Sequence, residues 1–263
     1  MQSVLADITP VILTFNEAPN IGRNLERLGW ARDVVVVDSG STDETEMIAR
    51  RFANVRWFTR RFDTHAQQWN FAVGETGVAS NWVLRLDADY MLEPELRDEI
   101  AALVPASDLA AYEIAFTYCI DGRKLRGSLY PPLPILFRRG EVRIVQDGHT
   151  EKFRPTGRVE PLAGRMLHDD RKSFERWFAS QKRYQAQEAA KLMSKPWRDL
   201  GWPDRIRRTR IFGAPAVAVH CLFVKGLLFD GAAGLRYTAQ RVMADLLLSL
   251  QLLRRDFGRK PLA

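Results

Sequence analysis

Cysteine is scarce in this chain of 263 residues, which contains only Cys119 and Cys221. The two stand far apart and match no metal-binding or redox spacing, which argues against a disulfide framework and fits a reducing compartment. Long uncharged apolar runs are also missing. The nearest one, residues 211–229, contains a proline, a histidine and a lysine, so we expect no simple membrane span.

A secretion signal is not expected, because the first seven residues are too short and too mixed in character to form one. Hydrophobic residues make up 46% of the chain and charged residues 27%, which excludes disordered and collagen-like classes. At about 150 residues per domain, the length allows one large domain or one domain with an appendage.

Positive charge is concentrated toward the C-terminus. The formal net charge is +7, and from Gly201 onward eleven Lys and Arg residues stand against four acidic ones. The same segment is rich in Leu, Val and Phe, which favours an anionic membrane surface over nucleic acid as its partner. Packing against a catalytic domain and a homodimer interface are the alternatives. The arginines expected to meet lipid head groups are Arg205, Arg207, Arg208 and Arg210.

Short apolar runs alternate with amphipathic stretches through the first 100 residues. Strands that alternate with helices indicate a largely parallel α/β sheet. Asn20 is a candidate N-cap, and residues 41–44 have the spacing of a capping box. The predicted strands are 11–15, 33–37, 55–58 and 82–86, and the predicted helices are 20–28, 44–52 and 65–74.

The rest of the chain is less regular. Its last helical stretch has apolar residues at 235, 239, 242, 246, 250 and 253, a spacing that forms one helix face. The predicted strands are 111–120 and 135–138, and the predicted helices are 173–193, 205–229 and 234–254.

Two acidic segments stand where predicted strands end. Asp87-Ala-Asp89 follows a buried strand, and such a carboxylate pair can hold Mg²⁺ or Mn²⁺, although the motif alone is a weak signal and is more often a solvated turn. Residues 38–43 (Asp-Ser-Gly-Ser-Thr-Asp) leave backbone N–H groups open to a ligand, or simply cap a helix. A dinucleotide site is excluded, because residues 14–17 (Thr-Phe-Asn-Glu) follow the first strand in place of a Gly-x-Gly-x-x-Gly loop.

Taken together, residues 10–17, 35–43 and 82–89 closely resemble the family 2 glycosyltransferases of the GT-A fold in order and separation. Residues 67–72 are similar to that family's stretch before the D-x-D strand, with Trp69 where a basic residue is usual. The resemblance covers about residues 8–170. It implies a mixed α/β sheet of Rossmann-like, nucleotide-binding type, flanked by helices.

The implied domains follow from the same resemblance. A catalytic domain would occupy residues 1–195, with a nucleotide-sugar half at 1–100 and an acceptor half at 101–195. Residues 196–263 would form a basic amphipathic helical extension that docks on the membrane.

Several downstream motifs look like the branch that contains lipopolysaccharide-core β-glucosyltransferases. Thr150 stands before the glutamate where a histidine is usual, with His149 one position earlier, and Leu133 stands where an aromatic residue is common. The motifs are residues 135–140, 148–151, 167–168 and 182–184, and an Asp-Gly-x-x-Gly element within 226–235.

The resemblance also implies a role for each candidate residue. Alternatives stay open for two of them: His168 could be a core or helix-capping histidine, and Glu151 could form a surface ion pair with Lys152. The implied donor residues are Phe15 and Glu17 in the nucleoside pocket, Asp38 on the uracil N3–H, Asn70, and Asp87 near the ribose; the implied metal ligands are Asp89 and His168, and the implied general base is Glu151.

The resulting expectation is an inverting transferase that moves a sugar, with UDP-glucose the favoured donor, to a hydroxyl of a lipid-linked saccharide at the cytoplasmic face of the membrane. One displacement at the anomeric carbon needs a carboxylate on the acceptor side and a divalent metal, Mg²⁺ or Mn²⁺, at the leaving diphosphate. The alternatives are transfer to a polyprenyl phosphate and a non-catalytic nucleotide-sugar- or membrane-binding module.

Overall fold

The computed structural model describes residues 3–147 and 150–258, and the chain divides into two compact units. The first unit comprises Met1–Cys119 and Tyr130–Arg171, and the second comprises Ile120–Leu129 and Lys172–Ala263. The long helix of residues 174–194 therefore falls in the second unit. The division into residues 1–195 and 196–263 stays a prediction.

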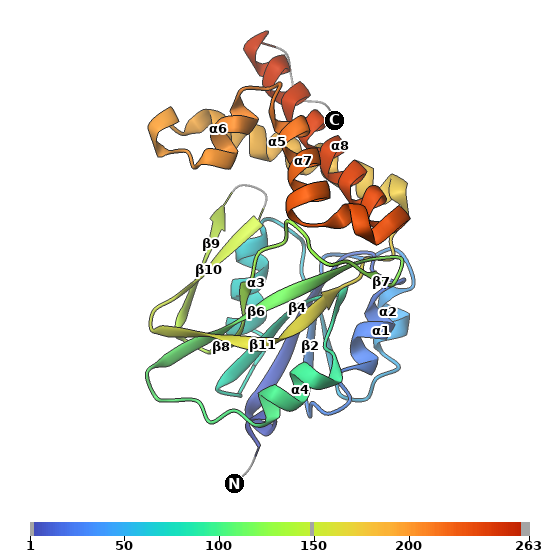
Figure 1. The fold of residues 1–263 in the computed structure, drawn as a ribbon. Helices are drawn as coiled ribbons and strands as arrows, with labels where there is room; N and C mark the ends of the chain where they lie inside the picture. Colours follow the sequence, from blue (N-terminus) through green and yellow to red (C-terminus); the bar gives the residue numbers. More distant parts are fainter. Residues whose placement is uncertain (1–2, 148–149, 259–263) are drawn as a thin grey trace. The chain divides into compact units, whose positions relative to one another are not determined.

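A mixed sheet forms the centre of the first unit (Figure 1). Its strands lie in the order β3-β2-β1-β4-β8-β6-β11-β5, with β3, β2, β1 and β4 parallel to one another and β8 antiparallel to both neighbours. This arrangement confirms the predicted mixed α/β sheet. The strands are β1 (Ile8–Thr14), β2 (Val34–Asp38), β3 (Val55–Thr59), β4 (Trp82–Asp87), β5 (Tyr90–Met91), β6 (Leu109–Ile120), β8 (Leu133–Arg138) and β11 (Arg158–His168).

Both faces of the central strands are covered, which explains why β1, β2 and β4 read as nearly continuous apolar runs. A short 3₁₀ turn, Val4–Asp7, precedes β1. The first face carries α1 (Ile21–Glu26), α2 (Thr45–Ala49) and α4 (Pro94–Ala101), and the second carries α3 (His65–Gly74) and a hairpin of β9 (Val142–Asp147) and β10 (Thr150–Pro155).

Asn20 stands at the N-cap position of α1, as predicted, whereas the predicted capping box at residues 41–44 is wrong. The Asn20 side chain makes no cap hydrogen bond and instead donates to Glu17 and Asp170. No side chain of the expected box at residues 41–44 caps α2. The Ser41 hydroxyl instead donates to Asp38 and accepts from the backbone N–H of Asn16. Local spacing could not reveal these partners, since one of them lies 150 residues away in the sequence.

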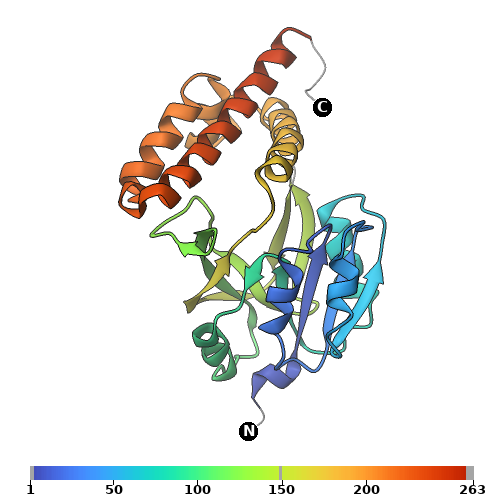
Figure 2. The ribbon, with the colours of Figure 1, turned by 90° about the vertical axis from the view of Figure 1, so that its right-hand side faces the viewer.

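The second unit is helical. Helices α5 and α7 pack against α8, and the runs of α7 and α8 lie side by side in Figure 2. A small apolar core between α5 and α8 includes Leu192, Leu248 and Leu252. The elements are β7 (Arg123–Lys124), α5 (Phe174–Ser194), α6 (Trp202–Arg208), α7 (Gly213–Val219) and α8 (Gly231–Asp256), with a 3₁₀ turn at Trp197–Asp199, a π-helical turn at His220–Val224 and a 3₁₀ turn at Leu227–Asp230.

The predicted single helix over 205–229 is wrong. The chain leaves the helical conformation at Arg210, whose φ is +71°, and again at Gly226, whose φ is also +71°. A left-handed residue interrupts an α-helix, and glycine adopts that conformation without a steric penalty. The segment is therefore divided into α6, α7 and the turns that lead to α8.

The predicted apolar stripe of α8 lies on the solvent side of that helix. Leu235, Leu246, Leu250 and Leu253 are 40 to 55% exposed, while residues on the opposite side of the helix are buried. No single helix in residues 3–147 and 150–258 is both long and apolar enough to cross a membrane. The segments Gly213–Val224 and Leu227–Asp256, bent by 73°, meet the length and composition requirements only as a pair.

Candidate functional site

The carboxyl ends of three parallel strands bring most of the predicted site residues to one edge of the sheet. Thr14 at the end of β1 is in register with Asp38 of β2, and Leu13 is in register with Asp87 of β4. The residues that follow these strands therefore emerge next to each other. In open α/β sheets this edge is where ligands bind.

The loop after β1 is tied to the loop after β2. Asn16, whose φ is +55°, accepts on its side-chain oxygen from the backbone N–H of Thr42 at 2.7 Å, and its own N–H donates to the Ser41 hydroxyl at 2.6 Å. The N–H of Glu17 donates to the Thr45 hydroxyl at 2.7 Å. These bonds hold a predicted nucleoside-pocket segment next to the acidic loop.

Asp38 fixes the shape of that acidic loop. Its side chain is buried, and one carboxylate oxygen accepts from the backbone N–H groups of Gly40 and Ser41 at 2.8 and 2.7 Å. Gly40 has a φ of +91°, a conformation that this tight turn requires and that glycine supplies. A carboxylate offers about four acceptor positions, so Asp38 retains capacity for a further donor. Phe15, 47% exposed, stands on the neighbouring loop.

Asp89 and His168 meet because of strand pairing. Tyr90 of β5 pairs with His168 at the end of β11, which places His168 Nε2 3.4 Å from a carboxylate oxygen of Asp89. Both side chains are largely buried. The structure thus brings together the two residues that the sequence proposes as metal ligands, although they are 79 positions apart in the chain.

His168 lies among four aromatic rings. Its Nδ1 is buried and has no hydrogen-bond partner within residues 3–147 and 150–258. The helix-capping alternative is wrong, because Ser173 caps the next helix. The rings, with centroid distances from the imidazole, are Tyr118 at 4.5 Å, Tyr130 at 4.8 Å, Tyr90 at 5.3 Å and Phe116 at 6.5 Å.

Two hydroxyl groups in this cluster are held in the neutral form. Burial, with a smaller contribution from the Asp87 carboxylate, raises the pKa of both Tyr90 and Tyr130 well above the usual range of tyrosine. Their hydroxyls are hydrogen-bonded to each other. The two rings therefore keep both hydroxyl protons at physiological pH, and one of these protons is used in the hydrogen bond between them.

The backbone carbonyl of Asp87 is held by the side chain of Asn24. The Asn24 side-chain amide, buried in α1, donates to the carbonyl oxygens of Asp87 at 2.9 Å and Tyr90 at 2.7 Å. Burial and the neighbouring Asp89 carboxylate raise the pKa of Asp87. Asn24 was not among the predicted site residues; its signal is a polar amide on the apolar side of helix 20–28.

Glu151 is buried and paired with Arg85, not with Lys152. Its carboxylate accepts from the Arg85 guanidinium, both side chains are 7% exposed, and the other oxygen lies 3.9 Å from His65 Nδ1. Lys152 instead pairs with Asp147. The surface ion-pair alternative for Glu151 is therefore wrong.

Arg85 connects Glu151 to the acidic strand end. It lies two residues before Asp87 on β4, so both side chains point to the same face of the sheet, and Asp87 interacts electrostatically with Arg85 and Glu151. The guanidinium also lies 4.0 Å from the ring centroid of Phe153 and 5.6 Å from that of Trp69. A charged residue inside a buried apolar strand needs a partner, which is the sequence signal that could have identified Arg85.

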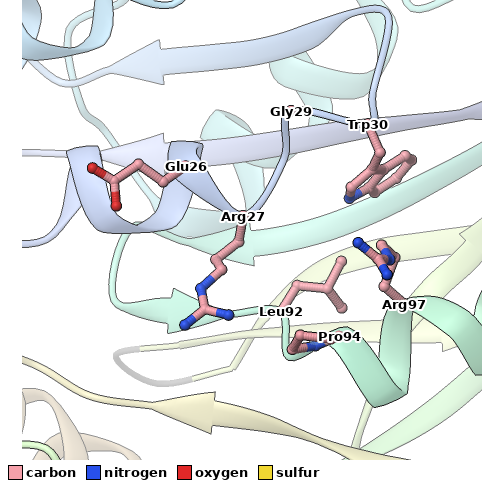
Figure 3. Close-up of a pocket in the computed structure, with 7 residues that line it drawn as sticks. All are labelled: Glu26, Arg27, Gly29, Trp30, Leu92, Pro94 and Arg97. Atoms are coloured by element: carbon pink, nitrogen blue, oxygen red, sulfur yellow. The ribbon is translucent and has the colours of Figure 1, made fainter.

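Asn70 has different surroundings. Its side chain is exposed, donates weakly to the carbonyl of Ile144 at 3.5 Å, and lines a hollow of about 410 Å³ with Val142 and Phe137. A second pocket of about 350 Å³ lies between the end of α1 and the start of α4, where Trp30 and Arg97 line it (Figure 3). Neither hollow is lined by the acidic strand ends. We therefore take the group formed by Asp38, Asp87, Asp89, Glu151 and His168 as the candidate site.

The side chains at this site suit a cation that is shared between the protein and a substrate. Within the described part of the chain no group of three or more His, Cys, Asp and Glu side chains is placed to hold a metal ion. A carboxylate and an imidazole that face each other, as Asp89 and His168 do, supply two ligands. Mg²⁺ and Mn²⁺ commonly take their remaining ligands from substrate phosphates and water, so these residues fit a cation bound together with a diphosphate.

Comparison with known proteins adds to this geometry. The lipopolysaccharide core biosynthesis glycosyltransferase LpsC of Rhizobium meliloti (strain 1021) is 29% identical over 176 residues, which are 61% of this chain and 62% of that protein. An uncharacterized glycosyltransferase of Rickettsia bellii (strain RML369-C) is 35% identical over 106 residues, which are 40% of this chain and 35% of that protein. The chain thus spans about three fifths and about one third of the lengths of these two relatives.

The fold has a counterpart among solved structures. The crystal structure of S. aureus TarS 1-349 in complex with UDP-GlcNAc has a TM-score of 0.50 and 14% identity, and the match covers 96% of this chain and 92% of that one. Residues 9–167 match the model of the family described as Glycosyl transferase family 2. That stretch is more than half of the chain and contains the acidic strand ends, Glu151 and most of β11, and so the chain belongs to glycosyltransferase family 2.

Proposed function

We propose that this protein is an inverting glycosyltransferase that moves a sugar from a UDP-sugar, with UDP-glucose the favoured donor, to a hydroxyl of a lipid-linked saccharide such as a lipopolysaccharide core. One observation carries the proposal: the Asp89–His168 pair and the buried Glu151–Arg85 pair both adjoin Asp87 at the ligand-binding edge of the sheet. That arrangement would supply a site for a leaving diphosphate and a carboxylate for an incoming hydroxyl.

The donor nucleoside would bind between the loops after β1 and β2. Asp38 has acceptor capacity left for the uracil N3–H, and the exposed ring of Phe15 offers a surface for stacking. Glu17, whose carboxylate accepts from Asn20 at 2.8 Å, would border the same pocket, and Asp87 would face the ribose. The hydrogen bonds between the two loops would keep this pocket formed before the donor arrives.

Asp89 and His168 would hold a divalent cation, Mg²⁺ or Mn²⁺, which would neutralise charge on the departing nucleoside diphosphate. The aromatic rings around His168 restrict its orientation, so that Nε2 stays directed toward Asp89. Tyr90 and Tyr130 remain protonated and can donate hydrogen bonds in this enclosed region.

Glu151 would act as the general base. As the acceptor oxygen attacks the anomeric carbon and the bond to the diphosphate oxygen breaks, the acceptor hydroxyl proton passes to a Glu151 carboxylate oxygen. Arg85 holds one of those oxygens, which orients the carboxylate without using both of its acceptor positions. A single displacement of this kind inverts the anomeric configuration.

A lipid-linked acceptor is supported by the likeness to LpsC and by the basic, apolar character of the second unit. We propose that the protein binds peripherally to the cytoplasmic face of the inner membrane, where such an acceptor is presented. Anionic lipid would attract the basic helices.

The test is a donor-hydrolysis screen across UDP-glucose, UDP-galactose and UDP-N-acetylglucosamine, with Mg²⁺, with Mn²⁺ and with chelator, followed by transfer to lipopolysaccharide-core acceptors. We expect metal-dependent release of UDP from one donor and a β-linked product. Thermal stabilisation by UDP should require the metal. Transfer to polyprenyl phosphate in place of a hydroxyl, or no turnover of any UDP-sugar, would contradict the proposal.

A further inference from the structure

The two units carry opposite charge. Residues of the second unit include 21 Lys and Arg against 8 acidic residues, a net charge of +13, whereas the first unit has 18 against 24, a net charge of −6. The positive charge is therefore not confined to the last 63 residues, because α5 and the segment Ile120–Leu129 add to it. A net charge of +13 favours contact of the second unit with an anionic surface over contact with the same unit of a second copy.

Exposed large apolar side chains are also concentrated in the second unit, which contributes 16 of the 21 in the described part of the chain. Five of them fall within eleven residues, where the chain reverses between α7 and α8. We call this group the apolar tip. Its residues and exposed fractions are Val219 at 57%, Phe223 at 67%, Val224 at 67%, Leu228 at 46% and Phe229 at 72%.

The apolar tip is built on the Asp-Gly-x-x-Gly element. The Asp230 carboxylate accepts from the backbone N–H and the guanidinium of Arg126 at 2.9 and 3.1 Å. Position 234 has no room for a Cβ atom, because one would lie 1.9 Å from the carbonyl oxygen of Leu227. Leu227 itself is fully buried, so the turn is anchored from inside while its phenylalanines point outward.

Three of the four arginines expected to meet lipid head groups also have partners inside the second unit. Arg207 pairs with Asp245 at 3.1 Å, and Arg210 pairs with Asp256 at 2.7 Å. The guanidinium of Arg208 donates to the backbone carbonyl of Lys195 at 2.8 Å. These bonds join α6 and its flanking turns to the rest of the second unit. Contact of these arginines with head groups stays a prediction, and the apolar tip is a separate candidate for the docking surface.

We propose that the apolar tip inserts into the boundary between head groups and acyl chains of an anionic bilayer, a deepening of the proposed membrane role of this protein. Phe223, Phe229 and their aliphatic neighbours would enter the acyl boundary. Arg126, whose guanidinium lies 5.7 Å from the Phe229 ring centroid, and Lys225 would remain at the phosphates. The net charge of +13 favours anionic lipid over a second copy as the occupant.

The experiment measures sedimentation of the purified full chain with vesicles, without any sugar donor. Vesicles of phosphatidylcholine alone are compared with vesicles of phosphatidylcholine mixed with an equal amount of phosphatidylglycerol. The test variant is F223S/F229S, and the matched control is L246S/L250S, which changes two exposed apolar residues on the outer stripe of α8. Circular dichroism confirms that each variant is folded, and light scattering reports its oligomeric state.

We expect wild type and L246S/L250S to bind the mixed vesicles equally well. The variant F223S/F229S should bind them at least about tenfold more weakly. Hydrolysis of soluble donor by F223S/F229S should be unchanged. Three results would overturn the inference: no binding by wild type, equal binding by F223S/F229S, or a wild-type dimer that F223S/F229S dissociates. Because binding is read without donor or acceptor, it is independent of whether the proposed transfer reaction occurs.

Discussion

Single residues decide the chemistry of the candidate site, and the Glu151–Arg85 pair shows how. Two opposite charges removed from water cost several kcal/mol each, and their attraction offsets that cost only when the hydrogen bonding is good. Here the pair is supported by the rings of Phe153 and Trp69 against the guanidinium. Trp69 occupies a position where related sequences usually have a basic residue. Its ring packs against the guanidinium of Arg85, which β4 supplies.

Removal of one partner of this pair should be costly. In Arg85→Met the Glu151 carboxylate would be left buried without its cation, and we expect a loss of about 3–5 kcal/mol in the free energy of unfolding. The double variant R85M/E151Q should recover part of that loss, because no uncompensated charge remains. Urea denaturation of the two single variants and the double variant gives the coupling energy, and additive effects would show that the pair does not interact.

The variant Glu151→Gln tests whether Glu151 acts as a general base or has only a structural role. The amide keeps the shape of the side chain and an oxygen for Arg85 but leaves the buried Arg85 cation without its anion, so we expect some loss of stability. Binding of the UDP-sugar should change little. Transfer should fall by about 10²–10⁴-fold, the usual loss when a general base is removed. Calorimetric donor binding is compared with the rate of transfer, and Glu141→Gln, at an exposed position, is the control. Parallel loss of affinity and rate would assign Glu151 to the donor side.

Asp89→Asn tests the proposed cation site. The variant keeps a side chain of the same size beside His168 but loses a charged ligand, and we expect turnover to fall by at least about 10²-fold. Stabilisation of the protein by UDP with Mn²⁺ should be lost as well, which thermal unfolding detects. Asp98→Asn on the exposed side of α4 should behave as wild type. A wild-type rate for Asp89→Asn would rule out the assignment.

At the scale of elements, backbone turns place the side chains that matter. β5 is only two residues long, yet its antiparallel pairing with β11 sets the Asp89–His168 distance. In the second unit the Asp-Gly-x-x-Gly element brings the 3₁₀ turn against the first turn of α8 so closely that only glycine fits at 234.

Gly234→Ala should therefore damage that element. The added methyl group would meet the carbonyl oxygen of Leu227, and relief requires a backbone shift, so we expect a loss of about 1–3 kcal/mol in stability. Gly29→Ala is the matched control, because no atom lies within 4 Å of its added Cβ. Thermal unfolding followed by circular dichroism compares the two, and equal melting temperatures would show that the turn can relax freely.

At the scale of the whole molecule, the separation of charge bears on the proposed membrane docking. An acidic unit holds the candidate site and a basic, apolar unit holds the apolar tip. Basic residues near an anionic membrane contribute about 1 kcal/mol each, and salt screens this attraction but does not weaken apolar insertion.

Vesicle binding should accordingly weaken as salt rises without disappearing. We expect the largest change between low and physiological ionic strength, where the screening length falls from about 30 Å to about 8 Å. Sedimentation at increasing NaCl concentrations measures it, with donor hydrolysis in the same buffers as the control. Binding that vanishes entirely in high salt would point to electrostatic adsorption alone and against insertion.

The sequence alone determined the features that depend on local pattern. Strands β1, β2 and β4 were predictable because strands buried on both faces are uniformly apolar, and α3 was predicted over the residues that form it. The strand-end carboxylates Asp38, Asp87 and Asp89 could be identified because parallel strands end at one edge. By contrast β11 has mostly half-exposed or exposed residues, and its pattern did not indicate a strand.

Tertiary structure decided everything that depends on partners far apart in the chain. Glu151 meets Arg85 across 66 positions, His168 meets Asp89 through a two-residue strand, and Asn24 fixes the loop after β4. The outward direction of the α8 stripe was also undecided by periodicity, which shows that a helix has an apolar face but not which neighbour covers it. Local propensity acts over a few residues, whereas burial, ion pairing and strand register are set only when the chain closes on itself.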